Sequence, residues 1–138
     1  IHRFFEAAFK GASINIFGRG DQTRDFIYID DVAKLLSVLI DRKITQQTIN
    51  ICSGQDFAIR SVAEMVINIT GSVSNCEFLP IPKGRENAEI KRSYGSTSKL
   101  ENLTGLKPSI GLQEGLKLMY NNIMCIALTE GIEKCVNA

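Results

Sequence analysis

The chain has 138 residues, of which 44% are hydrophobic and 22% are charged. This is the composition of a folded globular protein, and it excludes a disordered or collagen-like chain. The 16 Lys and Arg residues against 15 Asp and Glu give a net charge of +1, too balanced for a dedicated nucleic-acid binder. The four cysteines form no C-x-x-C pair, and His2 is the single histidine, so no metal site is expected. No segment has the pattern of a signal peptide or the length of a membrane span, so we expect a cytoplasmic protein with no membrane partner.

The first eleven residues predict a helix. Phe4, Phe5, Ala8 and Phe9 fall on one helical face, and Gly11 suits the position that ends such a helix. The sequence opens inside this amphipathic pattern without a methionine or a cap. We therefore expect a fragment of a larger protein.

Two strands and a helix are expected next. Residues 13–17 and 25–29 have the composition of strands, and the glycines of residues 18–21 predict a turn between them. Asp30 is expected to cap the following helix, and Asp31 to complement its dipole. The predicted buried side of that helix consists of Val32, Leu35, Leu36, Leu39 and Ile40.

The middle of the chain continues the alternation. Residues 48–52 predict a third strand, and residues 76–82 an extended segment that its prolines restrict to an edge. Between them a helix is expected to end at Gly71. Its apolar positions have helical spacing and are Ile59, Val62, Ala63, Val66 and Ile67.

The last third predicts a short strand within residues 90–94 and two helices. Ser96 is expected to cap the first helix, which Gly105 ends, and Gly111 precedes the second. The apolar stripe of the final helix is Leu112, Leu116, Met119, Tyr120, Ile123 and Ala127. Alternating strands and helices predict an α/β fold, or α+β if most neighbouring strands pair antiparallel.

The residues alone carry little legible chemistry. The segment from Gly18 to Gly20 lacks the third glycine and the strand-to-helix setting of a dinucleotide-binding loop, so a hairpin turn is the simpler interpretation. Arg24 lies beside this turn, and a guanidinium is a natural ligand for a phosphate or diphosphate. A lone arginine, however, more often pairs with a neighbouring carboxylate on the surface. Both interpretations stay open at this point.

The order of the motifs favours the first interpretation. Residues 14–33 closely resemble the "FG-x-G-x-Q-x-RDF-hydrophobic-x-hydrophobic-x-DVA" block of the extended short-chain dehydrogenases/reductases, the NAD-dependent nucleotide-sugar epimerases and dehydratases. Residues 50–54 are similar to the "NIGSG" step of that family, and residues 92–116 to its closing "RSYAD-x-SK…LGWKP…LEEGL" block. The resemblance covers nearly the whole chain. It implies a small sheet with several helices that forms the C-terminal, substrate-binding part of a Rossmann-type enzyme.

The resemblance also implies a ligand, a nucleotide-diphosphate sugar, and roles for individual residues. Each role fits the chemistry, because cations neutralise a diphosphate and a carboxylate accepts hydrogen bonds from a diol. The implied substrate-binding residues are Asn15 and Phe17 beside the base, Ile59 as an apolar contact, Arg24 and Arg85 at the diphosphate, and Glu89 at the ribose hydroxyls.

The chain departs from the family pattern at several positions. Cys52 stands where the family has glycine, and Gly95 and Ser96 replace its "AD" pair. The "R-x-G-[DE]" motif is disturbed by one extra residue in the segment 85–89, and Ala58 is a poor helix cap. These departures bear on the identity of the sugar more than on the family.

The largest departure is a missing set of catalytic motifs. The family's G-x-x-G-x-x-G loop does not occur in this sequence. Its Tyr-x-x-x-Lys pair does not occur either, because Tyr28, Tyr94 and Tyr120 have no lysine four residues later. We therefore expect residues 1–138 to be the substrate-binding portion, without catalytic residues and inactive alone. NAD is expected to bind mainly to an N-terminal Rossmann domain that this chain does not contain.

Two alternative functions remain. One is a non-catalytic module of the same family that binds a nucleotide or oligomerises. We expect a homodimer or a self-associating fragment, because the first helix and the strand at residues 48–52 would lack their cover. The other alternative, a membrane-surface role for the last helix, is disfavoured by its acidic residues Glu114, Glu130 and Glu133.

Overall fold

The computed structural model describes residues 1–84 and 90–129. The chain divides into two compact units, and each is described by itself. Unit 1 consists of Ile1–Gln22, Ala58–Lys91 and Leu116–Ala138. Unit 2 consists of Thr23–Phe57 and Arg92–Gly115.

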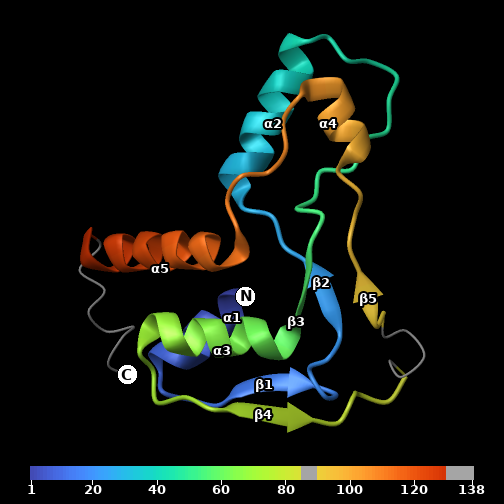
Figure 1. The fold of residues 1–138 in the computed structure, drawn as a ribbon. Coiled ribbons are helices and arrows are strands. Elements are labelled where there is room, and N and C mark those ends of the chain that lie inside the picture. The colour runs from blue at the N-terminus through green and yellow to red at the C-terminus, as the bar shows by residue number, and fades with distance from the viewer. Residues whose placement is uncertain (85–89, 130–138) are drawn as a thin grey trace. The chain divides into compact units, whose positions relative to one another are not determined.

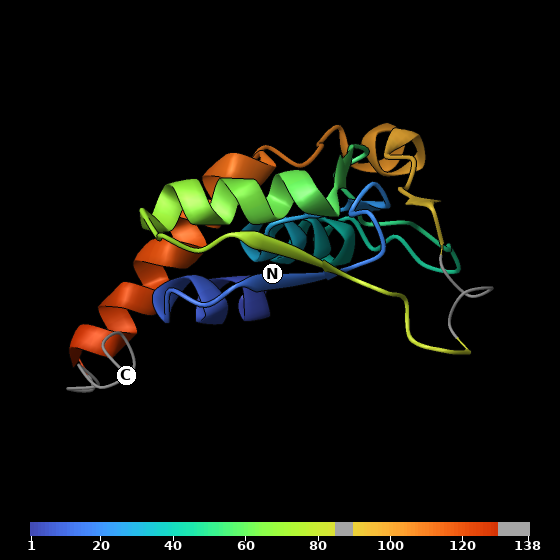
Figure 2. The same cartoon turned by 90° about the horizontal axis from the view of Figure 1, so that it is seen from below.

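Unit 1 is a two-stranded parallel sheet covered by helices. Strand β1 (Ile14–Phe17) pairs with β4 (Cys76–Leu79), and the two strands run side by side in the same direction in Figures 1 and 2. Helices α1 (His2–Phe9) and α3 (Ile59–Thr70) pack against each other on one side of this sheet (Figure 1). The helices predicted at these positions are confirmed.

The core of unit 1 follows from the alternation of β1. Ile14 and Ile16 are buried, whereas the residues between and after them are exposed, as expected for a strand with one covered face. The two isoleucines pack with Ala63 of α3. The partly buried residues around them are Phe4, Ala7, Ile59, Ile67 and Cys76. The predicted apolar faces of both helices are therefore the faces that meet the sheet.

The helix ends in unit 1 also agree with the sequence. Gly11 and Gly71 have φ values of +62° and +64°, the left-handed conformation in which glycine ends a helix without strain. Helix α5 (Leu112–Thr129) begins directly after Gly111, as predicted, and its residues from Leu116 onward belong to unit 1. Its Leu116 is buried, and the ring of Tyr120 lies 6.0 Å from that of Phe9.

Unit 2 contains a three-stranded sheet and two packed helices. Strands β2 (Thr23–Asp25), β3 (Asp56–Ala58) and β5 (Arg92–Ser93) lie in the order β3-β2-β5, and β2 and β5 are parallel. Helices α2 (Ile29–Asp41) and α4 (Ser98–Thr104) pack against each other (Figure 1). Because the registered strand pairs of both units are parallel, the fold class is α/β rather than α+β.

The second strand and the start of α2 differ from the prediction. The strand covers Thr23–Asp25 rather than residues 25–29, because its pairing with β5 involves Thr23 and Arg24. The amide of Val32 donates to the carbonyl of Tyr28, so the helix begins at Ile29 with Tyr28 as its N-cap. The prediction that Asp30 caps this helix is wrong.

The strand predicted at residues 48–52 is not found among the described residues. Strand-forming residues make a strand only when a neighbouring strand accepts their hydrogen bonds. Here the carbonyl of Thr48 accepts a hydrogen bond from Lys99 Nζ at 2.7 Å instead, and Cys52 is buried. The segment thus packs by side chains rather than by a backbone ladder.

Two further expectations need correction. Leu36 and Ile40 were expected on the buried side of α2, but they are 45% and 73% exposed. The buried face contains Asp31 and Leu35, and each residue turns the helix by about 100°, which carries Leu36 out of it. In α4 the N-cap is Thr97 rather than Ser96, whose hydroxyl accepts only a 3.4 Å contact from the amide of Ser98. Gly105 ends α4 as predicted, with φ +66°.

Among the residues that the structure describes, no helix is both long and apolar enough to cross a membrane.

Candidate functional site

Arg24 occupies the middle of β2 and is partly buried. Its register neighbour on β5 is Ser93. The guanidinium turns back on the chain, and Nη1 donates to the carbonyl oxygen of Thr23 at 2.7 Å. The orientation of the Arg24 side chain is therefore coupled to the backbone of the residue before it.

A polar cluster joins all three strands of unit 2. Thr23 Oγ1 donates to Asp56 Oδ2 at 2.5 Å, and Arg92 donates to the same carboxylate through Nε at 2.8 Å and Nη2 at 3.1 Å. The Arg92 guanidinium also lies 4.3 Å above the centre of the Tyr94 ring. Hydrogen bonds from Arg92 and then Thr23 lower the pKa of Asp56 to about 2, so the carboxylate is ionised and compensates the charge of Arg92.

Asp25, the next residue of β2, holds two loops. Its Oδ1 accepts hydrogen bonds from the amide and the hydroxyl of Ser53 at 2.8 and 2.7 Å. Its Oδ2 accepts from the amides of Gly54 and Gly95 at 3.0 and 3.3 Å. One carboxylate thus fixes the loop after residue 52 and the start of the segment that leads to α4.

Asp31 has the same function for the loop that leads into α5. It is 3% exposed, and it accepts hydrogen bonds from the amides of Ser109 and Ile110 and from the Ser109 hydroxyl at 2.8–3.0 Å. Burial by itself raises the pKa of Asp31, but these hydrogen bonds and the charge of Lys34 outweigh it, so the net pKa is below the ordinary value. The buried carboxylate is therefore kept ionised and fully bonded.

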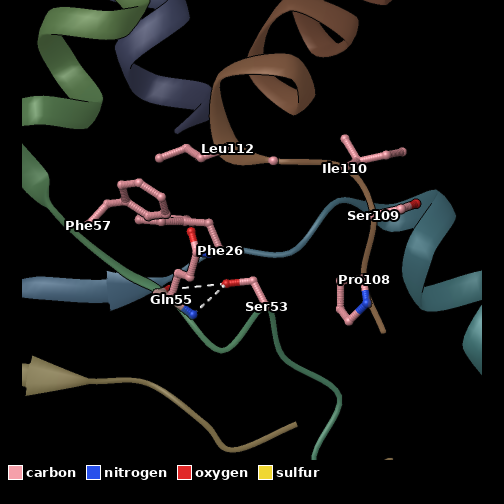
Figure 3. Close-up of a pocket in the computed structure, with 9 residues that line it drawn as sticks. Phe26, Ser53, Gln55, Phe57, Pro108, Ser109, Ile110 and Leu112 are labelled. Atoms are coloured by element: carbon pink, nitrogen blue, oxygen red, sulfur yellow. Dashed lines mark hydrogen bonds between the residues drawn. The ribbon is translucent and has the colours of Figure 1, made fainter. Parts of the chain in front are cut away.

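The loops held by Asp25 and Asp31 line one pocket of unit 2, with a volume of about 150 Å³ (Figure 3). Figure 3 shows the rings of Phe26 and Phe57 beside each other, with Gln55 next to them and Leu112 above. Small-molecule sites usually measure roughly 300–1,000 Å³, so this pocket alone is too small for a nucleotide sugar. The lining residues are Phe26, Ser53, Gln55, Phe57, Pro108, Ser109, Ile110, Gly111 and Leu112.

In unit 1 the predicted base-binding residues share the uncovered side of β1. Asn15 and Phe17 are exposed, Phe17 by 44%. The amides of Ile14 and Gly18 bond to β4, so by alternation the backbone groups of Asn15 and Phe17 point toward the other edge of the strand. Gln22 Nε2 donates to the carbonyl of Phe17 at 3.0 Å, which occupies one of these groups.

The structure gives less support to the remaining predicted substrate-binding residues. Ile59 is partly buried and packs against the core around Ile14, so its position is explained by packing. Arg85 and Glu89 lie outside the described residues. The structure therefore brings Asn15 and Phe17 together in unit 1 and places Arg24 in unit 2.

The described residues do not form a dinucleotide-binding loop. Gly20 has a φ of +73°, and a Cβ at this position would lie 3.1 Å from Arg60 Cβ and 3.2 Å from Phe78 Cε1. The close approach that a pyrophosphate would need is thus filled by side chains. No group of three potential metal ligands occurs in residues 1–84 and 90–129. The segment Gly18–Gly20 is a turn, but the prediction of a hairpin is wrong, because β1 pairs with β4 whereas β2 lies between β3 and β5 in another sheet.

Sequence reasoning missed the carboxylates that organise unit 2. Asp25, Asp31 and Asp56 make hydrogen bonds to residues 28 to 79 positions away in sequence. Asp25 and Asp31 lie inside the 14–33 block and Asp56 lies outside it, but local rules assign such aspartates only to strand ends and helix caps. Their partners are set by tertiary structure.

Comparison with known proteins gives a consistent class. Residues 1–52 match the NAD-dependent epimerase/dehydratase family. The chain is 31% identical over 121 residues to a UDP-N-acetyl-alpha-D-glucosaminuronate decarboxylase of Bacillus cytotoxicus, covering 85% of this chain and 37% of that protein. It is 31% identical over 122 residues to a UDP-glucuronate 4-epimerase of Thermodesulfobacterium geofontis, covering 88% of this chain and 36% of that protein. The chain therefore spans little more than a third of the length of these relatives.

A solved structure shows the same fold. A mutant UDP-glucuronic acid 4-epimerase of Bacillus cereus, in complex with UDP-4-deoxy-4-fluoro-glucuronic acid and NAD, superposes with a TM-score of 0.78 at 29% identity. The match covers 91% of this chain and 39% of that one. The fold and the 14–33 block thus define the class as an extended short-chain dehydrogenase/reductase. Within that class, the chain belongs to the NAD-dependent epimerase/dehydratase family.

Proposed function

We propose that this chain is the substrate-binding, C-terminal portion of an NAD-dependent nucleotide-sugar epimerase or dehydratase. The observation that carries the proposal is the position of Arg24 on β2, inside the segment that matches the family. In the intact enzyme the sugar is transiently oxidised to a keto intermediate, and NAD is held mainly by an N-terminal Rossmann domain. No described residue of this chain is assigned to that oxidation, and the chain alone is expected to be inactive.

Arg24 is proposed to bind the diphosphate. Its planar guanidinium can donate two parallel hydrogen bonds to phosphate oxygens, which a point charge cannot do. The other described arginine of the sheet, Arg92, is paired with Asp56 through two donors and is stacked on Tyr94. Arg92 is thus committed to Asp56, and the match of residues 14–33 to the family motif is what assigns the diphosphate to Arg24. Arg85 is proposed as a second cation at the diphosphate and Glu89 as the acceptor for the ribose hydroxyls.

The edge of β1 is proposed to hold the base. The carbonyl of Asn15 and the amide of Phe17 point to the same strand edge, which offers one acceptor and one donor side by side. A nucleobase presents a complementary donor and acceptor on its edge. The exposed ring of Phe17 and the side chain of Ile59 add apolar contact area.

An oligomerisation function is the second candidate, and one observation favours it. Ile29, Leu36 and Ile40 form an exposed stripe along α2, whereas Phe5 of the first helix is buried in its own unit. We therefore propose α2, rather than α1, as the self-association surface. Light scattering should show Ile40→Glu shifting the chain toward monomer, with Ser37→Glu, which adds the same charge at another exposed residue of α2, as the control. A monomeric wild-type chain would remove this candidate.

Titration calorimetry of the chain with UDP-glucose tests the main proposal. Arg24→Ala should weaken binding by roughly 10- to 100-fold, because a charge-assisted hydrogen bond contributes roughly 1.5–3 kcal/mol. Arg24→Lys should recover only part of the affinity, since an ammonium cannot match the fork geometry. Arg3→Ala, which removes an exposed arginine of α1, is the control for net charge. Equal affinity in all four proteins, or none in the wild type, would refute the assignment.

A further inference from the structure

We propose that Thr23, Asp56 and Arg92 form a positioning unit that orients Arg24 for the diphosphate. This inference rests on the proposed function and adds three residues that do not touch the ligand. In this proposal the polar cluster not only joins the three strands of the sheet but also orients a binding residue. All residues involved lie in unit 2.

The connection runs through Thr23. Arg24 Nη1 donates to the carbonyl of Thr23, so any change in the Thr23 peptide plane moves the guanidinium. The side chain of the same threonine donates to Asp56 Oδ2 on β3. Asp56 is in turn held by two hydrogen bonds from Arg92 on β5. Thr23 is thus fixed from both neighbouring strands, and Arg24 inherits that orientation.

The strand register places the polar cluster and Arg24 on opposite faces of the sheet. Thr23 pairs with Arg92 and Arg24 pairs with Ser93, and successive side chains of a strand point to opposite faces. The cluster therefore occupies one face of the sheet and Arg24 the other. This arrangement lets the cluster act on Arg24 through the backbone without occupying its ligand face. The lowered pKa of Asp56 is consistent with a carboxylate that stays ionised and bonded.

A purely electrostatic role for Asp56 and Arg92 makes different predictions, which allows a test. If the pair acted only by charge, Asp56→Asn would strengthen the binding of an anion and Arg92→Gln would weaken it. The double variant would then behave like the wild type. Positioning predicts that both single variants weaken binding by roughly three- to tenfold, and that the double variant is no better than either single one.

Thr23 provides the variant without a charge change. Thr23→Val removes the hydroxyl but keeps the shape of the side chain, and Thr23→Ser keeps the hydroxyl. Calorimetric titration with UDP-glucose should show weaker binding for Thr23→Val and near wild-type binding for Thr23→Ser. The Nε–H resonance of Arg24, followed by NMR without ligand, should shift in Thr23→Val and Asp56→Asn but not in the serine variant. This readout separates positioning from a general loss of stability.

The outcomes distinguish the two proposals. If wild-type protein binds UDP-glucose through Arg24 but Thr23→Val binds equally well, the positioning unit is refuted and the proposed function stands. Opposite effects of Asp56→Asn and Arg92→Gln, with an unchanged Arg24 resonance, would also refute it. If the wild type does not bind UDP-glucose, both proposals fall.

Discussion

The two units of this chain are stabilised internally by different kinds of interaction. In unit 1 the described residues bury mainly apolar side chains, whereas in unit 2 most of the long-range side-chain hydrogen bonds go to carboxylates. The buried apolar residues of unit 1 are Phe5, Ala8, Ile14, Ile16, Val62, Ala63, Val66 and Leu116. Those of unit 2 are Leu35, Cys52 and Leu100. Asp25, Asp31 and Asp56 together bond the loops and strands of unit 2.

The two kinds of interaction constrain the fold to different degrees. Apolar burial is non-directional and tolerates changes that conserve volume, whereas a carboxylate that accepts several amides fixes loop positions closely. In unit 2 the fixed loops surround a pocket, and the fixed strand carries Arg24. In unit 2, which has the fewer buried apolar side chains among the described residues, carboxylate hydrogen bonds thus hold the loops beside the pocket.

The largest expected effect is in the core of unit 1. Ile16→Ala removes a fully buried side chain between the sheet and α3, and should lower the free energy of unfolding by roughly 2–5 kcal/mol. Val73→Ala, at a residue that is 92% exposed, is the control and should have an effect near zero. Urea denaturation followed by circular dichroism measures both. Equal stabilities would mean that apolar burial does not hold this unit.

The next effect is expected at the buried carboxylate of unit 2. Asp31→Asn turns an acceptor into a group that also donates, facing the amides of Ser109 and Ile110. The change should cost about 1–3 kcal/mol and increase amide hydrogen exchange in the loop before α5. Asp30→Asn, one residue earlier and exposed, should leave both measurements unchanged. Unaltered exchange of the Ser109 amide in Asp31→Asn would show that the Asp31 carboxylate does not hold this loop.

The departures from the family pattern at Cys52 and Gly95 are expected to be coupled. A Cβ on Gly95 would lie 2.5 Å from Cys52 Sγ and 2.9 Å from its Cβ, so alanine cannot fit beside the cysteine. Gly95→Ala should destabilise the chain by about 1–3 kcal/mol, and Cys52→Gly in addition should recover part of this loss. Gly111→Ala, which meets no atom within 4 Å, is the matched control. Strictly additive effects would show that the two positions do not compensate each other.

The smallest expected effect is a dependence on acidity that is confined to unit 2. The folded-state pKa values of Asp31 and Asp56 are lowered, that of Asp56 to about 2. A lowered pKa stabilises the fold above the unfolded-state value near 4 and loses that contribution as pH falls through the folded value. NMR spectra recorded from about pH 5 to about pH 2 should therefore show unit 2 amides shifting before those of β1 and β4. If the amide signals of unit 2 and those of β1 and β4 changed at the same pH, the carboxylate hydrogen bonds would not be what makes unit 2 sensitive to acid.

Much of unit 1 could be predicted from the sequence because its signals are local. The period of α3 and the alternation of β1 place Val62, Ile14 and Ile16 inside before any contact is known. The helix ends at Gly11 and Gly71 follow from the freedom of glycine to adopt positive φ. The alternation of β1 also leaves Asn15 and Phe17 exposed, although only the resemblance to the family made them candidate binding residues.

Periodicity, helix-ending residues and motif order predicted the alternation of strands and helices, most helix boundaries and the resemblance to the family, but they left α/β and α+β both open. Tertiary contacts were needed to establish an α/β fold from the parallel strand pairs, to show which strands form, and to show what the aspartates bind. Residues 48–52 have strand composition, but a strand also needs a neighbour to accept its hydrogen bonds, and neighbours are chosen over long separations in sequence. In the same way Asp56 became the partner of Thr23 and Arg92 because β3, β2 and β5 meet in one sheet, which no local pattern specifies.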